Sequence, residues 1–432
     1  MKLSRGVVGV LAAAGLLAAG AGAGWQPPNK GKDAKGAPKI ITRVDPHDWT
    51  FTGSVNLRVY EEKDVKTNMP KKEAFDFTSA AIVYPLVGET ASSVLVGKES
   101  DVTGKLRLND RVIAEKPNEI LVDYPAGTKL AKWSMMGWKG EEVSVELKFS
   151  MTSWQTKFDE ALANKCKWAE NYPGAAATAL EPEYWIDIGL DGPYDMAPVK
   201  DLVKKWMGGK DPKTISPVQA AKFLAGQVMQ HVQTSGNGIA TNKVGEMSGI
   251  ALQGAPTTAK LGRGSEFDMV QLLVAVYRQI GLPARSVIGW DAGESKDKFL
   301  GKGGSAAMRA WVEFALVDPN QPDPVWVPVD VVRMRKSSTR PPALDRPWPF
   351  FGDNKELDGV IPFAFQFFPP SKGVISYGSP AFFGWMVTPK PPEHVVQTLK
   401  FGAISTPKRA EDMKKDEERR KDEKKKKSPY GG

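Results

Sequence analysis

The sequence predicts an α+β protein in which a β-sandwich comes first and a mixed domain of helices and strands follows. In the first region apolar residues alternate with polar ones, as at Val55, Leu57 and Val59, which is typical of strands with one buried face. Further along, apolar residues recur at the spacing of a helix face from about residue 217 and again from 266. Short runs of strand length come after these helices, and that order favours the α+β class.

The sandwich is expected over residues 45–153. The alternation at 55–59 recurs at 143–149, and residues 80–84 and 105–113 are predicted as further strands because Gly, Asn and Pro separate these runs. A chain of 432 residues is long enough for two or three domains. A sandwich of this size therefore leaves room for a second domain.

The second domain, an α+β domain, is expected over residues 155–390. A helix is predicted at 155–170, and a better-marked one begins at Ser216-Pro217, where serine caps the helix and proline occupies its first position. Another helix is predicted from Glu266 to Ile280, ended by Gly281. The strands expected after it are 285–290, 309–317 and 325–332.

Residues 1–23 are predicted to be a secretory signal. Lys2 and Arg5 give a basic start, an uncharged run of apolar and small residues follows, and small residues at 19–21 and 21–23 form two candidate cleavage sites. No later stretch reaches about 20 uninterrupted apolar residues, so no membrane span is expected. The mature protein is expected to be secreted or periplasmic.

Most of the net charge of +9 lies outside the predicted domains. The signal contributes +2, and residues 24–44, a predicted flexible linker rich in Pro, Gly and Lys, contribute +4. Residues 408–432 add another +4 and alternate basic with acidic blocks, which is typical of a disordered tail. Residues 45–407 are left with about −1. Because a nucleic-acid-binding protein would carry basic residues on its folded surface, no nucleic-acid partner is expected.

The aromatic residues and the cysteine are interpreted as structural. The 13 tryptophans are predicted to fill a core rather than to line a polymer-binding groove. The aromatic and proline-rich extension at 350–387 is expected to pack onto the second domain rather than form an exposed binding surface. Cys166 is the only cysteine, so no internal disulfide can form, and no reactive motif surrounds it. It is interpreted as an inert thiol.

Three segments of the second domain form an ordered motif. The first starts at Gly262-Arg263-Gly264-Ser265-Glu266 and leads into a helix that exits through Gly281-Leu282-Pro283-Ala284-Arg285. The others are Arg309-Ala310-Trp311-Val312-Glu313 and Trp326-Val327-Pro328-Val329-Asp330. Together they resemble the core of bacterial transglutaminase-like proteins over about residues 200–335. The resemblance implies a papain-like fold and a Cys-His-Asp unit that transfers acyl groups through a thioester.

Two of the three triad positions hold other residues here. Arg309 stands where the family has histidine, and a guanidinium that is always protonated cannot act as a base. At the cysteine position the family spacing, counted back from Gly281, gives Glu266, whereas one inserted residue would give Ser265. Only Asp330 matches the triad. No residue is therefore assigned a catalytic role, and the protein is predicted to be a pseudoenzyme.

The same residues allow two other uses. Ser265 could be a nucleophile only with a base in reach, and none of the three histidines, His47, His231 and His394, lies at the motif's strand position. Alternatively, Glu266, Arg309 and Asp330 could form a carboxylate–guanidinium–carboxylate cluster. No phosphate loop, zinc ligand set or EF-hand spacing is present, so no cofactor or metal is expected.

Three functions stay open on these grounds. The favoured one is an exported, non-catalytic transglutaminase-like protein that binds a peptide or cell-envelope polymer, or serves as a scaffold. The second is an acyltransferase or peptidase that uses Ser265 as an unusual nucleophile. The third is an interaction protein in which the sandwich and the tail at 408–432 do the binding.

Overall fold

The computed structural model describes residues 39–59, 73–122, 125–181, 195–292, 308–318, 321, 323–365 and 384–405. All of them belong to one compact unit that begins at Pro38. The expected signal, most of the expected linker and the expected tail lie outside the described residues.

The larger sheet of the sandwich is built on two long strands, β1 (Ile41–Val59) and β9 (Glu142–Phe158), which pair antiparallel. Strand β19 (Val395–Ser405) pairs with β1, on the side away from β9. The remaining strands of this sheet are β3 (Glu89–Thr90), β4 (Ser93–Leu95), β5 (Thr103–Leu108) and β6 (Arg111–Ala114).

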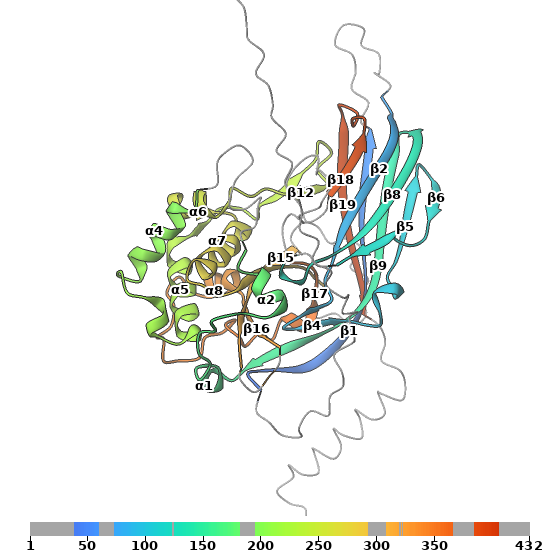
Figure 1. The fold of residues 1–432 in the computed structure, drawn as a ribbon. Helices are drawn as coiled ribbons and strands as arrows, with labels where there is room; N and C mark the ends of the chain where they lie inside the picture. Colours follow the sequence, from blue (N-terminus) through green and yellow to red (C-terminus); the bar gives the residue numbers. More distant parts are fainter. Residues whose placement is uncertain are drawn as a thin grey trace, which may run out of the picture. The chain divides into compact units, whose positions relative to one another are not determined.

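The second sheet has the order β18 (Gly384–Thr388), β2 (Phe75–Leu86), β8 (Lys129–Gly140) and β7 (Glu119–Leu121). It lies beside the first sheet in Figure 1. The approach of the two sheets depends on Gly104 of β5, because a Cβ there would lie 2.6 Å from Cζ2 of Trp133 on β8. The predicted sandwich is confirmed, but β18 and β19 complete it from the far end of the chain, a pairing that local periodicity cannot reveal.

Local structure differs from the sequence prediction at three places in the sandwich. Residues 41–44, expected in the linker, are the start of β1 and pair with the end of β9. That pairing keeps residues 155–158 extended, so only α1 (Glu160–Ala163) is helical within the helix expected at 155–170. The strand expected at 105–113 is the β5–β6 hairpin, turned at Asn109 with a φ of 51°.

The second domain contains the predicted helices α5 (Pro217–His231) and α7 (Glu266–Gln279). The Ser216 hydroxyl accepts a hydrogen bond from the backbone N–H of Gln219, and Gly281 has the positive φ of 78° that ends α7. The other helices are α2 (Gly174–Thr178), α4 (Ala197–Trp206), α6 (Ala255–Leu261) and α8 (Val331–Ser337). The described residues also form the 3-10 helices η1 (Glu99–Asp101) and η2 (Pro125–Gly127) in the sandwich region, and η3 (Pro212–Thr214) and η5 (Leu357–Gly359) in the second domain.

An antiparallel sheet of four strands carries the helices. Its order is β16 (Val325–Val329), β15 (Met308–Leu316), β14 (Ala284–Asp291) and β17 (Val360–Ala364). Helix α7 packs against it, with the Tyr277 and Phe314 rings 5.7 Å apart and nearly perpendicular. Two short pairs, β10 (Gln233–Thr234) with β13 (Arg263–Gly264) and β11 (Ile239–Thr241) with β12 (Met247–Ile250), lie before α7 in sequence.

Aromatic side chains join this sheet to the larger sheet of the sandwich. The Phe363 ring of β17 stacks 5.5 Å from that of Phe51 and 5.3 Å from that of Phe401. Trp290 of β14 lies 5.3 Å from the same Phe401 ring. The second domain is therefore α+β and is held against the sandwich by a shared core.

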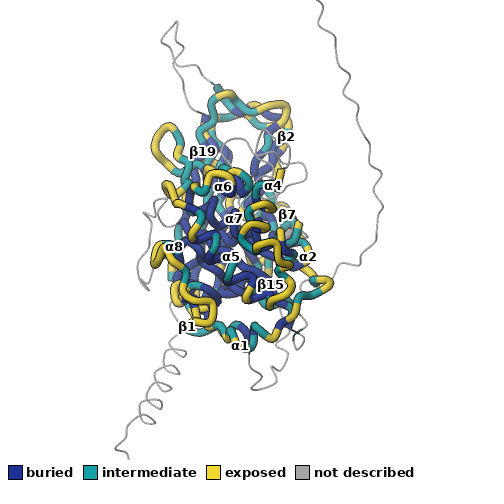
Figure 2. Tube along the Cα trace, turned by 90° about the vertical axis from the view of Figure 1, so that its left-hand side faces the viewer, coloured by how far each residue is buried: buried dark blue, intermediate teal, exposed yellow. Residues whose placement is uncertain are grey.

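Burial agrees with a core role for part of the described aromatic residues. Helices α5 and α7 are largely buried and β15 is buried throughout, and Figure 2 draws much of the chain around their labels in dark blue. Six tryptophans among the described residues are buried: Trp49, Trp133, Trp290, Trp311, Trp348 and Trp385. In the extension, Phe351, Phe363 and Phe365 are also buried, whereas residues 366–383 lie outside the described part. No helix in the described residues combines the length and apolar character that a membrane crossing requires.

Candidate functional site

A cavity of about 290 Å³ lies where the N-terminus of α7 meets the starts of β15 and α8. Three of the four residues considered for the triad positions line it, namely Glu266, Arg309 and Asp330. The fourth, Ser265, does not. The other lining residues are Asn237, Phe267, Asp291, Met308, Ala310, Val332, Arg333 and Lys336.

Ser265 is the N-cap of α7, and its hydroxyl is fully engaged. The hydroxyl donates to Oδ2 of Asp268 at 2.8 Å and accepts from the Asp268 backbone N–H at 3.1 Å. The Asp268 carboxylate in turn accepts the Ser265 backbone N–H at 2.9 Å, which completes a capping box. Gly238 covers the side chain, since a Cβ on it would lie 2.7 Å from the Ser265 Oγ. The hydroxyl therefore has a structural role and faces a carboxylate rather than an imidazole.

Arg309, which the sequence analysis aligned with the family's histidine, lies at the start of β15 and is bound to Asp330. Its Nε and Nη2 both donate to Oδ2 of Asp330, at 3.0 and 2.6 Å. Both side chains are almost completely buried. Burial by itself would lower the pKa of the guanidinium, but the carboxylates of Asp330, Glu356 and Asp291 together raise that pKa above its ordinary value. Arg309 thus stays charged and offers no basic nitrogen.

Asp330 also explains where β16 ends. A strand was expected as far as Val332, but β16 stops at Val329, and Asp330 caps α8 by accepting the Arg333 backbone N–H on Oδ1 at 3.0 Å. One oxygen of Asp330 therefore serves the helix while the other serves Arg309. In the family motif an aspartate at this place would orient a histidine. In this chain Asp330 binds the Arg309 guanidinium and caps the N-terminus of α8.

The partner of Glu266 is a lysine, whereas the sequence analysis considered a cluster of Glu266, Arg309 and Asp330. Its carboxylate lies 2.7 Å from Nζ of Lys336 on α8. The carboxylates beside Arg309, apart from Asp330, are Glu356, 3.0 Å from Nη1, and Asp291, 3.7 Å from Nη1. The guanidinium–carboxylate cluster thus exists, but distant segments supply two of its acidic members.

Arg333 of α8 extends this cluster along the cavity wall. Its Nε lies 3.1 Å from Glu356, and its Nη2 lies 3.7 Å from Asp291. Sequence reasoning missed Arg333, Asp291 and Glu356, because no motif places them and only the fold brings their segments together.

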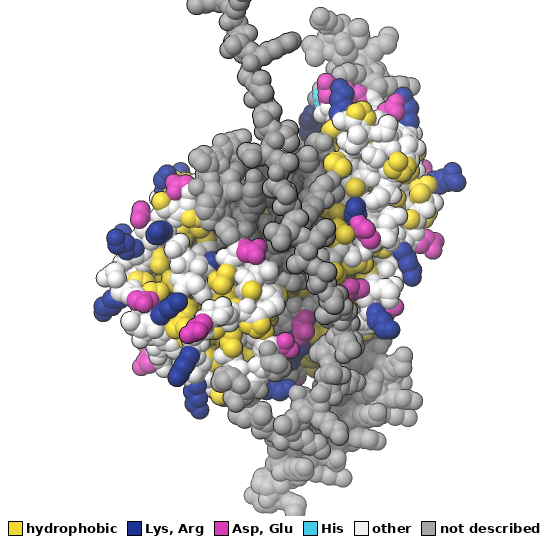
Figure 3. Space-filling view, in the orientation of Figure 1, with side chains coloured by type: hydrophobic (Ala, Val, Ile, Leu, Met, Phe, Trp, Pro, Cys, Tyr) yellow, Lys and Arg dark blue, Asp and Glu magenta, His cyan; other side chains and the backbone are white. Residues whose placement is uncertain are grey.

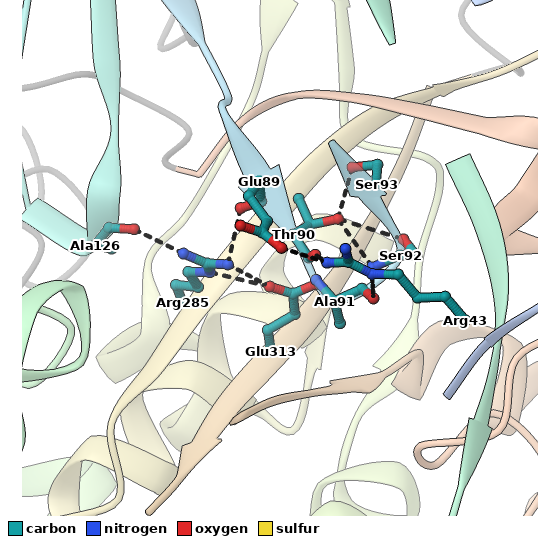
Figure 4. A network of polar contacts seen from close by, with 9 residues as sticks. All are labelled: Arg43, Glu89, Thr90, Ala91, Ser92, Ser93, Ala126, Arg285 and Glu313. Atoms are coloured by element: carbon teal, nitrogen blue, oxygen red, sulfur yellow. Dashed lines mark hydrogen bonds and ion pairs between the residues drawn. The ribbon is translucent and has the colours of Figure 1, made fainter. Parts of the chain in front are cut away.

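Two of the motif residues meet in a buried network away from the cavity (Figure 4). Arg285 at the start of β14 donates through Nε and Nη2 to Oε2 of Glu313 on β15, at 3.0 and 2.7 Å. The guanidinium lies between the rings of Trp326 and Phe365, at 3.8 and 3.7 Å from their centroids. Burial lowers the pKa of Arg285, while Glu313 opposes that effect.

The same network ties the second domain to the sandwich. Glu313 accepts the backbone N–H of Ala91, which lies between β3 and β4, at 2.9 Å. Arg43 of β1 binds that turn through the carbonyl oxygens of Ala91 and Thr90 and the carboxylate of Glu89. The motif's Arg285 and Glu313 are therefore joined to each other and to the neighbouring sheet, and their role is structural.

None of the three histidines lines the cavity. His231, at the end of α5, has Nε2 2.9 Å from the Ala259 carbonyl oxygen, which can only accept, so Nε2 carries the proton. His47 has Nδ1 3.4 Å from Asp358, and His394 has Nδ1 3.5 Å from Glu73. Each ring has a partner other than Ser265, and the Ser265 hydroxyl is bonded to Asp268 rather than to a histidine.

Cys166 is buried and lies outside the cavity. Burial, together with the negative charge of Asp318, raises the pKa of its thiol to about 11. These surroundings disfavour the thiolate, which agrees with an inert thiol.

One group of side chains in the described residues has donor atoms placed as metal ligands would be. Oxygens of Glu73 and Glu393 and a ring nitrogen of His394 all lie within 4.8 Å of one another. Carboxylate and imidazole donors suit a divalent first-row metal. The sequence analysis found no such set, because Glu73 is about 320 residues away from the other two. The group does not line the cavity beside Arg309.

Charged side chains of both signs are interspersed on the face seen in Figure 3. Neither sign gathers into a large patch over the described elements of this face. This distribution agrees with the near-neutral charge of residues 45–407.

Residues 200–331 match the family model of the transglutaminase-like superfamily. The chain therefore carries a transglutaminase-like domain, and the matched segment runs from α4 to the start of α8. No curated protein matches the chain.

Among solved structures, a candidate cysteine protease from Cytophaga hutchinsonii is 11% identical, with 86% of this chain and 94% of that chain covered and a TM-score of 0.47. The periplasmic domain of TgpA from Pseudomonas aeruginosa, bound to ethylmercury, is 12% identical, covers 61% and 96%, and has a TM-score of 0.24. A candidate protease from Parabacteroides distasonis is 12% identical, covers 56% and 41%, and has a TM-score of 0.21. The assignment to the superfamily therefore depends on residues 200–331.

Proposed function

We propose that this chain is an exported transglutaminase-like protein that performs no acyl transfer and uses its cleft to bind a peptide or cell-envelope polymer. The observation that carries the proposal is the pair of Arg309 and Asp330. A permanently charged guanidinium occupies the position of the base, and it takes up the carboxylate that would orient a histidine.

The nucleophile position supports the same conclusion. Ser265 donates its hydroxyl proton to the Asp268 carboxylate within a helix cap. A carboxylate could take a proton from serine only weakly, because its basicity is far below that of the alkoxide. Glu266, the other candidate for this position, is held by Lys336. Neither residue has the imidazole partner that acyl transfer through an activated nucleophile requires.

Ligand binding is supported by the cavity that remains at the same place. It has a volume of about 290 Å³ and is lined by six charged side chains and Asn237. The partly exposed Arg333, Lys336, Glu266 and Asp291 offer charged groups that a polar ligand in the cavity could contact.

Catalysis is tested with the mature chain, residues 24–432, assayed for amine incorporation and for peptide hydrolysis beside an active transglutaminase. We expect no product above background for the wild type or for Ser265→Ala. Activity that is present in the wild type and lost in Ser265→Ala would establish the alternative, an acyltransferase or peptidase with Ser265 as nucleophile.

Export rests on the predicted signal at residues 1–23. The full-length chain is expressed in a bacterium, and the mass of the protein recovered outside the cytoplasm gives its N-terminus. We expect cleavage after residue 21 or 23. Leu16→Arg places a charge in the apolar run and should leave uncleaved protein in the cytoplasm. Cytoplasmic retention of the wild type would contradict export.

A further inference from the structure

We propose that the cavity beside Arg309 binds the carboxylate end of a small ligand, such as the C-terminus of a peptide, between Arg309, Arg333 and Lys336. This inference deepens the proposed function by naming the ligand chemistry of the same cleft, and it rests on that function.

The three cations of the cavity have acidic partners of two kinds. Asp330 is buried and binds Arg309 through two short hydrogen bonds. Glu356, Asp291 and Glu266, by contrast, have side chains that are 41%, 29% and 30% exposed. A partly exposed carboxylate is solvated when it leaves a cation, so its replacement by another carboxylate costs little. Asp330 is therefore a fixed partner, and the other three are exchangeable.

Arg309 retains a donor for such a ligand. Its Nη1 is buried and makes no aligned hydrogen bond with any described residue, although Glu356 lies 3.0 Å away. A buried N–H without an aligned acceptor is unfavourable, and a ligand carboxylate that approached it in line would remove that cost. The planar guanidinium of Arg333 lines the same cavity and can supply a second donor.

The charge balance favours a carboxylate over a phosphate. The lining holds Arg309, Arg333 and Lys336 against Glu266, Asp291 and Asp330, so its formal charge is zero. Glu356, which lies beside Arg309 and Arg333 but outside this lining, brings the formal charge of the group to −1. A ligand carboxylate that takes the place of Glu356 leaves that charge unchanged. A phosphate that carries nearly two charges would meet several carboxylates close by, and their repulsion would outweigh the gain.

The size of the cavity favours the end of a chain. Its volume of about 290 Å³ lies at the lower limit of small-molecule sites, which span roughly 300–1,000 Å³. The middle of a polymer chain would have to enter the cavity and leave it again. A terminal residue can enter the cavity with its carboxylate first.

The test measures binding of N-acetyl-Ala-Ala to the mature chain by calorimetry at low salt, with N-acetyl-Ala-Ala-amide as the neutral counterpart. We expect the acid to bind and the amide to bind at least about tenfold more weakly. Glucuronate tests a sugar carboxylate as the source, and inorganic phosphate tests the charge argument. Phosphate binding as tight as that of the acid would overturn the proposal, as would equal binding of acid and amide or no binding of either.

Substitution of an acidic residue and of a basic residue of the cluster should change the affinity for the acid in opposite directions. Glu356→Gln removes a competing carboxylate and should tighten binding of the acid several-fold, an effect that a purely structural role of Glu356 would not produce. Arg333→Gln should weaken binding about tenfold. Arg335→Gln is the matched control on the same helix, outside the cavity, and should change nothing. Unchanged affinity in both Glu356→Gln and Arg333→Gln would overturn the site.

Failure of this inference is distinguishable from failure of the proposed function. Mass spectrometry of the same samples reports any hydrolysis of the amide, which would refute the non-catalytic function whatever the affinities are. If the peptide amide binds as well as the acid and stays intact, the binding function survives and the carboxylate specificity is refuted.

Discussion

Arg309 donates two hydrogen bonds to one oxygen of Asp330, and the other oxygen of Asp330 caps α8. The pair couples the start of β15 to the junction of β16 and α8, which are the elements that would carry the histidine and aspartate of the family motif. Under the proposed function, this buried ion pair stands where the family motif has its histidine and aspartate.

The buried ion pair predicts strong coupling between its members. Arg309→Met leaves Asp330 charged and buried, so the free energy of unfolding should fall by about 3–5 kcal/mol. Asp330→Asn keeps an oxygen to cap α8, and the double variant should lose at least about 2 kcal/mol less than the sum of the single variants. Urea unfolding measures all four proteins. The exposed pair of Lys139 and Asp76 is the control, with an expected coupling below about 1 kcal/mol.

The capping role of Ser265 predicts a change in stability without a change in chemistry. Ser265→Ala should lower the free energy of unfolding by about 0.5–2 kcal/mol, as loss of a helix cap does. Ser216→Ala, which removes the equivalent cap of α5, should have an effect of the same order. Thermal unfolding measures both variants. A Ser265→Ala protein as stable as the wild type would contradict the capping role.

The stacked position of Arg285 predicts that lysine cannot replace it. Arg285→Met leaves the Glu313 carboxylate buried without its partner and should cost about 3–5 kcal/mol of unfolding free energy. Arg285→Lys keeps the charge but loses the planar group between Trp326 and Phe365, so it should recover only part of that loss. Denaturant unfolding checks this, with Arg335→Met as the control. Full recovery by lysine would show that stacking contributes little.

The contacts of Lys222 predict which segment becomes more accessible to a protease when the charge of this side chain is removed. Its buried ammonium binds Glu160 at 2.5 Å and the carbonyl oxygens of Leu344 and Arg346 at 3.1 and 2.6 Å. Lys222→Met keeps the length of the side chain but leaves both carbonyls without their donor. Limited proteolysis should then cut faster within 338–349, while Lys205→Met on the exposed side of α4 should not change the rate. Equal cutting of both variants would refute the role of Lys222.

The raised pKa of Cys166 predicts slow alkylation. The thiolate is the reactive form, and with a pKa of about 11 it makes up only about one thiol in a thousand at pH 8. Native protein should therefore resist iodoacetamide at pH 8, react faster as the pH rises toward 11, and react fully once unfolded. Mass spectrometry after timed quenching measures the modified fraction. Rapid modification of the native protein at pH 8 would contradict the assignment.

Periodicity and local signals predicted the helices well. The serine cap and proline of α5 and the glycine after α7 are chemical signals that act within a few residues, so their effect does not depend on the rest of the chain. The alternation of β1 and β9 likewise predicted strands with one buried face. Residues 155–158 were predicted wrongly as helix, because pairing with residues 41–44 overrides local propensity.

The sequence alone determined the fold class, and it predicted from the resemblance that arginine at position 309 stands where the family has histidine, because both inferences depend on which residue types occur in which order. Arginine at position 309 cannot accept a proton in any fold. Only the tertiary structure decided which side chains surround Arg309. Asp291, Arg333 and Glu356 reach Arg309 from separate elements, and β18 and β19 complete the sandwich from the end of the chain. Such contacts depend on long-range packing, for which local sequence patterns carry no signal.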